Sequence, residues 1–117
     1  MKEYKRSERV GDLIQREVSL MLLRDIKDPR VEMVSVTGVK VGDDLRHATL
    51  FFSVMGDAKR WDEAAKGLAS SKGFIRRELG RRLKMKYIPD IHFKEDRSLE
   101  QGERIDRILS QLDVKDE

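Results

Sequence analysis

The sequence predicts an α+β domain in which helices cover a three-stranded sheet in the order α-β-β-α-α-β, followed by one further helix. Three observations support this fold class. Apolar residues recur at helical spacing near the N-terminus and again after residue 60, whereas they alternate with polar residues between residues 33 and 54. A short alternating segment after Pro89 supplies the third strand. We expect a single domain over residues 1–112 and a short acidic tail over residues 113–117.

The first element is a predicted helix from an N-cap at Ser7 to about Arg24. The segment Asp28-Pro29-Arg30 ends it, because a residue before proline avoids helical geometry. The apolar residues at helical spacing are Val10, Leu13, Ile14, Val18 and Met21.

Two strands are predicted to follow as a hairpin around a turn at residues 42–44. The first runs from Met33 to Val41, and its valines change phase at Gly38, which predicts a β-bulge there. The second strand has alternating apolar residues at Ala48, Leu50, Phe52 and Val54.

Two helices are then predicted, the first over residues 61–70 after a start near Asp57 or Arg60. The second follows a break at Ser71-Lys72-Gly73, and its apolar side is formed by Ile75, Leu79 and Leu83. Beyond the strand with Ile91 and Phe93, Ser98 is the expected N-cap of a last helix. The apolar residues of that helix are Leu99, Ile105, Ile108, Leu109 and Leu112.

Positive charge is concentrated in residues 72–86, which hold seven basic residues and one acidic residue. The whole chain has a net charge of +3, so the remaining 18 basic and 21 acidic residues sum to −3. Arg77, Arg81 and Lys84 lie opposite the apolar stripe, while Arg76 and Arg82 lie beside it and could extend from its edges. A solvated helix surface is the plain alternative, but such surfaces usually mix charge signs. We therefore predict an RNA-binding surface.

The candidate RNA-binding residues fall into two sets. The first set, on the basic segment, is Lys72, Arg76, Arg77, Arg81, Arg82, Lys84 and Lys86, and the second set is Lys5, Arg6, Arg9, Lys59 and Arg60. Few aromatic residues are available for base stacking, so recognition of RNA shape and backbone is expected more than base readout.

Two consecutive helices between strands are typical of KH-type folds, which place RNA backbone against the helix–helix junction. The usual Gly-x-x-Gly junction is absent, and Ser70-Ser71-Lys72-Gly73 stands in its place. Lys72 and the amides of the following helix would favour a phosphate there. A simple helix break or kink at Ser71, Lys72 and Gly73 is the structural alternative.

Several motifs, in this order and spacing, resemble the ribosome-binding factor A family of bacterial small-subunit assembly factors, over about Arg9 to Leu112. They are Asp28-Pro29-Arg30, Asp44-Leu45 with Ala48, Gly73-Phe74-Ile75-Arg76 with Leu79-Gly80, Pro89 with Ile91-His92-Phe93, and Asp96 with Ser98-Leu99. The resemblance implies a KH-like fold in which Ser71-Lys72-Gly73 occupies the family's Ala-x-Gly kink, with serine in place of alanine.

The resemblance also implies a function. Family members bind the immature small subunit near its neck against 16S ribosomal RNA, support maturation of the 5′ end of that RNA, and leave before translation. They are linked to growth at low temperature. Some members have a long C-terminal extension, and functions of such an extension are not carried over to this chain.

Other function classes are less well supported by the sequence. His47 and His92 are isolated strand histidines, there is no cysteine, and no phosphate-loop or dinucleotide motif occurs, so neither an enzyme nor a cofactor or metal site is expected. No apolar segment approaches the length of a membrane span or a signal sequence, so a cytoplasmic location is expected. We also expect the chain to be a monomer. A protein-interaction domain that uses the last helix, or a general KH-like RNA-binding module, remains the alternative.

Overall fold

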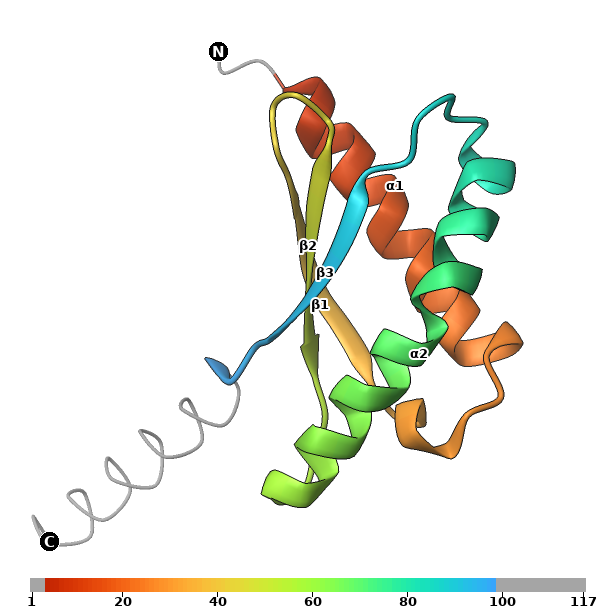
Figure 1. Cartoon of the computed structure of the whole chain (residues 1–117). Helices are drawn as coiled ribbons and strands as arrows, with labels where there is room; N and C mark the ends of the chain where they lie inside the picture. The colour runs from red at the N-terminus through yellow and green to blue at the C-terminus, as the bar shows by residue number, and fades with distance from the viewer. Residues whose placement is uncertain (1–3, 99–117) are drawn as a thin grey trace, which may run out of the picture.

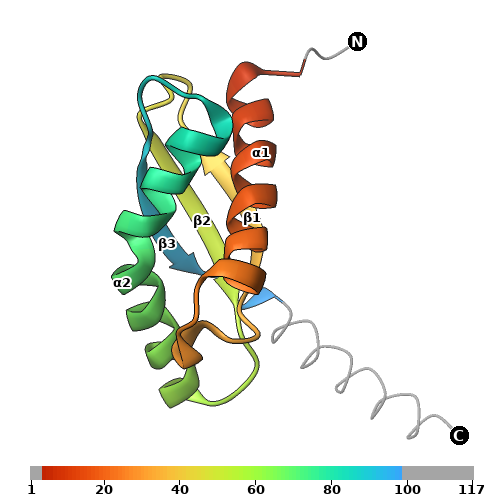
Figure 2. The same cartoon turned by 90° about the vertical axis from the view of Figure 1, so that its right-hand side faces the viewer.

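A computed structural model describes residues 4–98, in which both helices cover one face of a three-stranded sheet (Figures 1 and 2). The helices are α1 (Arg6–Leu20) and α2 (Ala58–Leu83), and the strands are β1 (Ser35–Val41), β2 (His47–Ser53) and β3 (Asp90–Glu95). A π-helical turn, Met21–Asp25, extends α1, and a 3-10 turn, Pro29–Val31, follows it.

The sheet has the order β1-β2-β3, with β1 antiparallel to β2 and β2 parallel to β3. The parallel pair requires a crossover connection, which α2 provides. The register of β1 against β2 shifts between Val36 and Gly38, which confirms the predicted bulge. The extra residue lets Val36 and Val41 both point into the core despite their opposite phase in the sequence.

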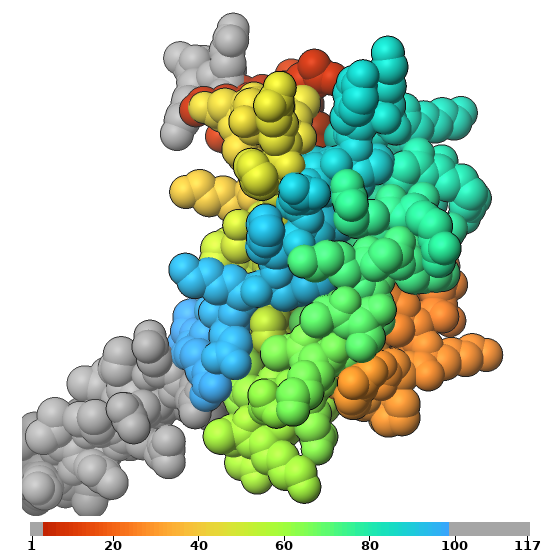
Figure 3. All heavy atoms as spheres, in the orientation of Figure 1, coloured from red at the N-terminus to blue at the C-terminus, as the bar shows by residue number. Residues whose placement is uncertain are grey.

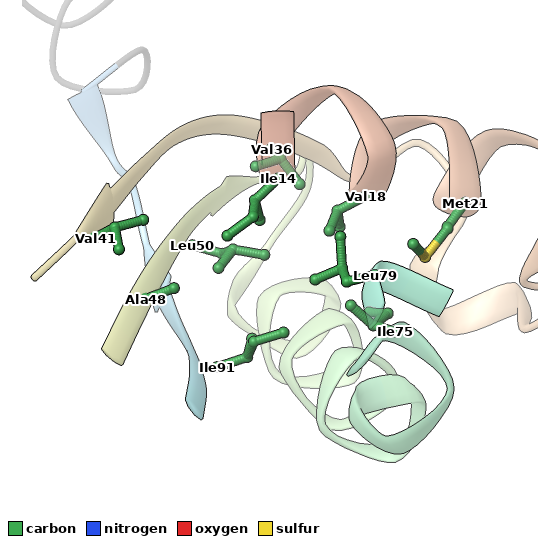
Figure 4. Close-up of a cluster of buried hydrophobic side chains, with 10 residues drawn as sticks. All are labelled: Ile14, Val18, Met21, Val36, Val41, Ala48, Leu50, Ile75, Leu79 and Ile91. Atoms are coloured by element: carbon green, nitrogen blue, oxygen red, sulfur yellow. The ribbon is translucent and has the colours of Figure 1, made fainter. Parts of the chain in front are cut away.

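The core lies between the sheet and the two helices, and its larger cluster is shown in Figure 4. Ile14, Val18 and Met21 from the α1 side meet Ile75 and Leu79 of α2 above the sheet residues. The sheet contributes Val36, Val41, Ala48, Leu50 and Ile91 to this cluster. The predicted apolar faces are therefore confirmed, except that Leu13 is 38% exposed.

A second buried cluster packs the first half of α2 against the end of the hairpin. It consists of Val31, Phe52, Val54, Trp61, Ala64 and Leu68. Because both halves of α2 bury an apolar side against the same sheet, the whole helix lies along it.

The predicted break between two helices is wrong, because α2 is a single helix of 26 residues through Ser71, Lys72 and Gly73. Its axis nevertheless changes direction about midway along its length (Figure 1). The Ser71 hydroxyl donates a 3.0 Å hydrogen bond to the carbonyl of Gly67, a contact that commonly bends helices. The chain therefore changes direction without interrupting the helix.

The ends of the elements match the predictions in part. Asp57 is the N-cap of α2 and accepts a 3.0 Å hydrogen bond from the Arg60 backbone N–H, as expected. The N-cap of α1 is Lys5, so the prediction for Ser7 is wrong; Ser7 is buried and donates to Asp43 Oδ1 at 3.3 Å. The predicted last helix and the acidic tail lie outside the described residues. No helix within residues 4–98 is long and apolar enough to cross a membrane.

Two glycines of α2 provide a matched test of this packing. A Cβ added at Gly67 would lie 2.8 Å from Arg30 Cβ and from Val31 Cγ1, whereas one added at Gly73 would meet no atom within 4 Å. We expect Gly67→Ala to lower the free energy of unfolding by about 1–3 kcal/mol through overpacking. Gly73→Ala should raise it by about 0.5–1 kcal/mol, because alanine favours the helix. Urea denaturation followed by circular dichroism measures both, and equal effects would contradict the close contact at Gly67.

Candidate nucleic-acid interface

The side of α2 that faces away from the core presents the basic residues Arg77 and Arg81. The opposite side of the helix is buried through residues such as Leu68, Ile75 and Leu79. Arg77 is exposed and has no ion pair with any described residue. Arg81, one turn later, is also exposed, with 69% of its side chain accessible. The predicted outward orientation of these two residues is confirmed, and Arg77 is the more available of the two for an anion.

Glu78 is the single acidic residue of the basic segment, and it is shared by two arginines. Its carboxylate accepts from Arg81 Nη2 at 2.8 Å and from Arg82 Nε at 3.2 Å. The hydrogen bonds from Arg81 are the main cause of the lowered pKa of Glu78, and the same contact raises the pKa of Arg81. Glu78 is therefore held in its charged form and partly neutralises Arg81.

Arg82 has a different role from the one predicted for it. Only 20% of its side chain is exposed, and its guanidinium contacts Asp25 Oδ2 at 2.5 Å, Glu17 Oε2 at 3.4 Å and Glu78 Oε1 at 3.2 Å. The hydrogen bond to Asp25 is the main cause of its raised pKa. The guanidinium of Arg82 is therefore already paired with three carboxylates. These ion pairs link α2 to α1 and to the π-helical turn, so Arg82 is not free to contact a ligand.

Lys72 and Arg76 lie on another flank of α2, next to β3. Arg76 contacts Asp90 Oδ1 at 3.6 Å and donates to the carbonyl of Ile88 at 3.4 Å. Lys72 is half-buried one turn before Arg76 and therefore lies on the same flank. The structure thus separates these two residues from Arg77 and Arg81.

Lys84 and Lys86 lie beyond the helix, which ends at Leu83. Lys84 is the C-cap in the left-handed conformation, with φ of 52°, so the prediction that it continues the helical stripe is wrong. Both lysines are exposed. The start of α1 lies at this same end of the molecule (Figures 1 and 2). Its N-cap Lys5 and its first-turn residues Arg6 and Arg9 are exposed.

Lys59 and Arg60 are far from this end. The helix rise places Lys59 about 33 Å from Arg81 along α2. Lys59 is exposed, whereas Arg60 donates to the backbone carbonyls of Arg30, at 2.7 Å, and Glu32. Arg60 therefore stabilises the loop before β1, and neither Lys59 nor Arg60 forms one patch with the basic segment.

The loop before β1 adds basic residues that the sequence analysis missed. Arg30 donates to Ser70 Oγ at 3.3 Å, which places it beside the outward side of α2, and Lys27 is exposed earlier in the same loop. Figure 3 shows this loop (orange) next to α2 (green) on one face. The motif Asp28-Pro29-Arg30 was interpreted as a helix end and as part of the family resemblance, and the residue after its proline also contacts α2.

Comparisons with known proteins show which family this chain belongs to. The family model described as Ribosome-binding factor A matches residues 6–109. Ribosome-binding factor A of Geobacter sulfurreducens is 45% identical over 112 residues, which cover 96% of this chain and 95% of the relative. The chain belongs to the ribosome-binding factor A family.

Solved structures of the family have the same fold. The crystal structure of ribosome-binding factor A from Thermus thermophilus matches with a TM-score of 0.67 at 17% identity, over 76% of this chain and 94% of that one. A homology model of the Thermus thermophilus factor, fitted into a cryo-electron microscopy map of a 30S complex, matches with a TM-score of 0.56 at 19% identity, over 73% and 93%. The predicted KH-like α+β fold is thereby confirmed.

Family membership also bears on the kind of activity. A ribosome-binding factor is described by what it binds and is a non-enzymatic kind of protein. Within residues 4–98 no group of three or more His, Cys, Asp or Glu residues is placed to hold a metal ion.

The different roles of Arg82 and Arg77 predict different effects of their removal. Arg82→Ala should lower the thermal unfolding midpoint, because Glu17, Asp25 and Glu78 lose their shared cation. Arg77→Ala should leave the midpoint within about 3 °C of the original, since an exposed side chain without an ion pair contributes little. Thermal unfolding by circular dichroism compares the two, and a larger loss for Arg77→Ala would contradict these assignments.

Proposed function

We propose that this chain is an assembly factor that binds the free or immature small ribosomal subunit through phosphates of its 16S ribosomal RNA. Membership of the family supports ribosome binding, and the Thermus thermophilus relative was fitted into a map of a 30S complex. The single observation that supports RNA phosphates as the partner is the exposed Arg77, without a carboxylate partner among residues 4–98, one turn from Arg81.

The chemistry of these residues suits such a role. Arginine donates charge-assisted hydrogen bonds to phosphate, and phosphate contacts position a protein without reading base sequence. Each phosphate neutralised lowers the logarithm of affinity by about 0.7–0.9 for each tenfold increase in salt. Binding of this kind fixes the orientation of the protein on the RNA but remains reversible. A factor that later leaves the ribosomal subunit needs both properties.

The finer parts of the proposal follow from the family resemblance. The factor acts late in maturation of the small subunit, supports processing of the 5′ end of 16S ribosomal RNA, and contributes to growth in the cold. It acts in the cytoplasm as a monomer. A general KH-like RNA-binding module would share the fold and the basic surface but would show no preference for the small subunit.

Sedimentation with isolated small subunits, large subunits and whole ribosomes, at low and moderate salt, tests the partner. We expect co-sedimentation with the small subunit alone, weakening as salt rises. Equal binding to all three particles would favour the general RNA-binding module. Binding to the small subunit that does not change with salt would favour a protein contact.

Charge reversal tests the surface. Arg77→Glu with Arg81→Glu should weaken binding to the small subunit by about 100-fold or more, because two charged hydrogen bonds are lost. The matched control is Lys40→Glu with Lys94→Glu, which makes the same change in charge on exposed residues of β1 and β3. Arg77→Ala alone removes the cation without adding a carboxylate one turn before Arg81, and unfolding midpoints verify the folded state. Equal losses for the two double variants would indicate a nonspecific charge effect, and original affinity for the Arg77 variants would contradict the proposal.

A further inference from the structure

The loop between α2 and β3 presents an exposed aromatic ring beside two lysines. Tyr87 is 77% exposed, more than any other aromatic residue among residues 4–98. A single exposed apolar side chain is common on protein surfaces and by itself indicates no partner. Tyr87 differs because it is aromatic and directly follows the basic end of α2.

The loop is held on both sides, so the exposure of Tyr87 follows from the fold around it. At one end, Ile88 packs onto α2 at Gly80, where a Cβ would lie 3.3 Å from Ile88 Cδ1, and Pro89 is fully buried. The backbone N–H of Asp90 then donates to the carbonyl of Arg46 at 2.8 Å. At the other end the loop leaves α2 through Lys84. The chain is therefore anchored on both sides of Tyr87, and the ring is exposed to solvent.

The charges around the ring favour an anion. Lys86 Nζ lies 5.6 Å from the centre of the Tyr87 ring, over one of its two faces. Lys84 is exposed three residues earlier, and Arg81 lies in the last turn of α2. The second face of the ring is left for another planar group, since most of the side chain is accessible. An aromatic face flanked by cations is complementary to a nucleotide, which joins a flat base to a phosphate.

We propose that Tyr87 stacks on an unpaired RNA base while Lys84 and Lys86 contact the phosphates beside that base. This inference rests on the proposed RNA-binding function and adds a base-stacking site to it. Stacking of this type tolerates every base, because each has a π face, so the site selects single-stranded over paired RNA without reading sequence. Figure 3 shows that the loop (cyan) continues the surface formed by the second half of α2. The loop that carries Tyr87 thus adjoins the helix that carries Arg77 and Arg81.

The test uses two single-stranded RNAs of about ten nucleotides, one with bases and one in which the central nucleotides are abasic. Fluorescence anisotropy at low salt gives the affinity of the full chain for each. Tyr87→Leu keeps the apolar side chain but removes the aromatic ring, and should weaken binding of the base-bearing RNA about 5- to 100-fold. Its affinity for the abasic RNA should stay unchanged, and Tyr87→Phe should bind both RNAs within about twofold of the original.

Two controls separate this proposal from the one on which it rests. Met55→Ala removes a similarly exposed apolar side chain from the β2–α2 connection and should bind both RNAs normally. Arg77→Glu should weaken both RNAs alike, because it removes a phosphate contact. If Arg77→Glu weakens both while Tyr87→Leu weakens neither, the stacking proposal is overturned and the phosphate-binding surface stands.

The remaining outcomes also decide the question. Equal losses of both RNAs with Tyr87→Leu would show that the residue acts without a base, which overturns stacking. Unchanged RNA affinity together with weaker binding to the small subunit would assign the loop to a ribosomal protein instead. Failure of the original chain to bind either RNA would overturn both the stacking site and recognition of free single strands.

Discussion

The position of α2 depends on its close contact with the Pro29–Val31 turn at Gly67. Side-chain atoms of Arg30 and Val31 approach within 2.8 Å of the place where a Cβ would stand, so only glycine fits there without a shift. The turn is fixed by the Asp28–Arg30 ion pair of 2.7 Å and by the hydrogen bonds from Arg60 to its backbone. Because the turn follows α1, this contact sets α2 relative to α1 and the sheet. With the helix in this place, its apolar stripe is buried against the sheet and its basic side chains Arg77 and Arg81 face outward.

Most of the fold could be predicted from the sequence because its determinants are local. The change of phase among the valines around Gly38 predicted the bulge, and Asp57 predicted the start of α2. The helix break failed for a reason that local sequence does not contain. Serine and glycine at residues 70–73 weaken a helix, but apolar residues on both sides of them, from Trp61 to Leu79, bury one continuous stripe against the sheet. Tertiary packing therefore outweighed intrinsic helix propensity.

The sequence predicted where positive charge is concentrated in the candidate interface. It did not predict which of these basic side chains form ion pairs or hydrogen bonds within the protein. The sequence shows seven basic residues in 72–86, yet it does not show that Arg82 meets Asp25 and Glu17, which precede it by 57 and 65 residues. Arg60 likewise donates to carbonyls about 30 residues earlier. Contacts at such separations depend on how α2 lies on α1 and the loop. The structure divides the predicted residues into cations that stabilise the fold, such as Arg82, and cations open to a ligand, such as Arg77.

This division constrains how tightly the surface holds RNA. Glu78 occupies part of the Arg81 guanidinium, so a phosphate at Arg81 has to compete with a carboxylate already in place. Arg77, about 6 Å earlier along the helix axis, has no such competitor among residues 4–98. Of these two neighbours, Arg77 is therefore expected to contribute more to a phosphate contact than Arg81. Phosphate contacts fix the orientation of the RNA without reading its sequence, and their weakening by salt keeps the complex reversible, which is what an assembly factor of the kind proposed needs.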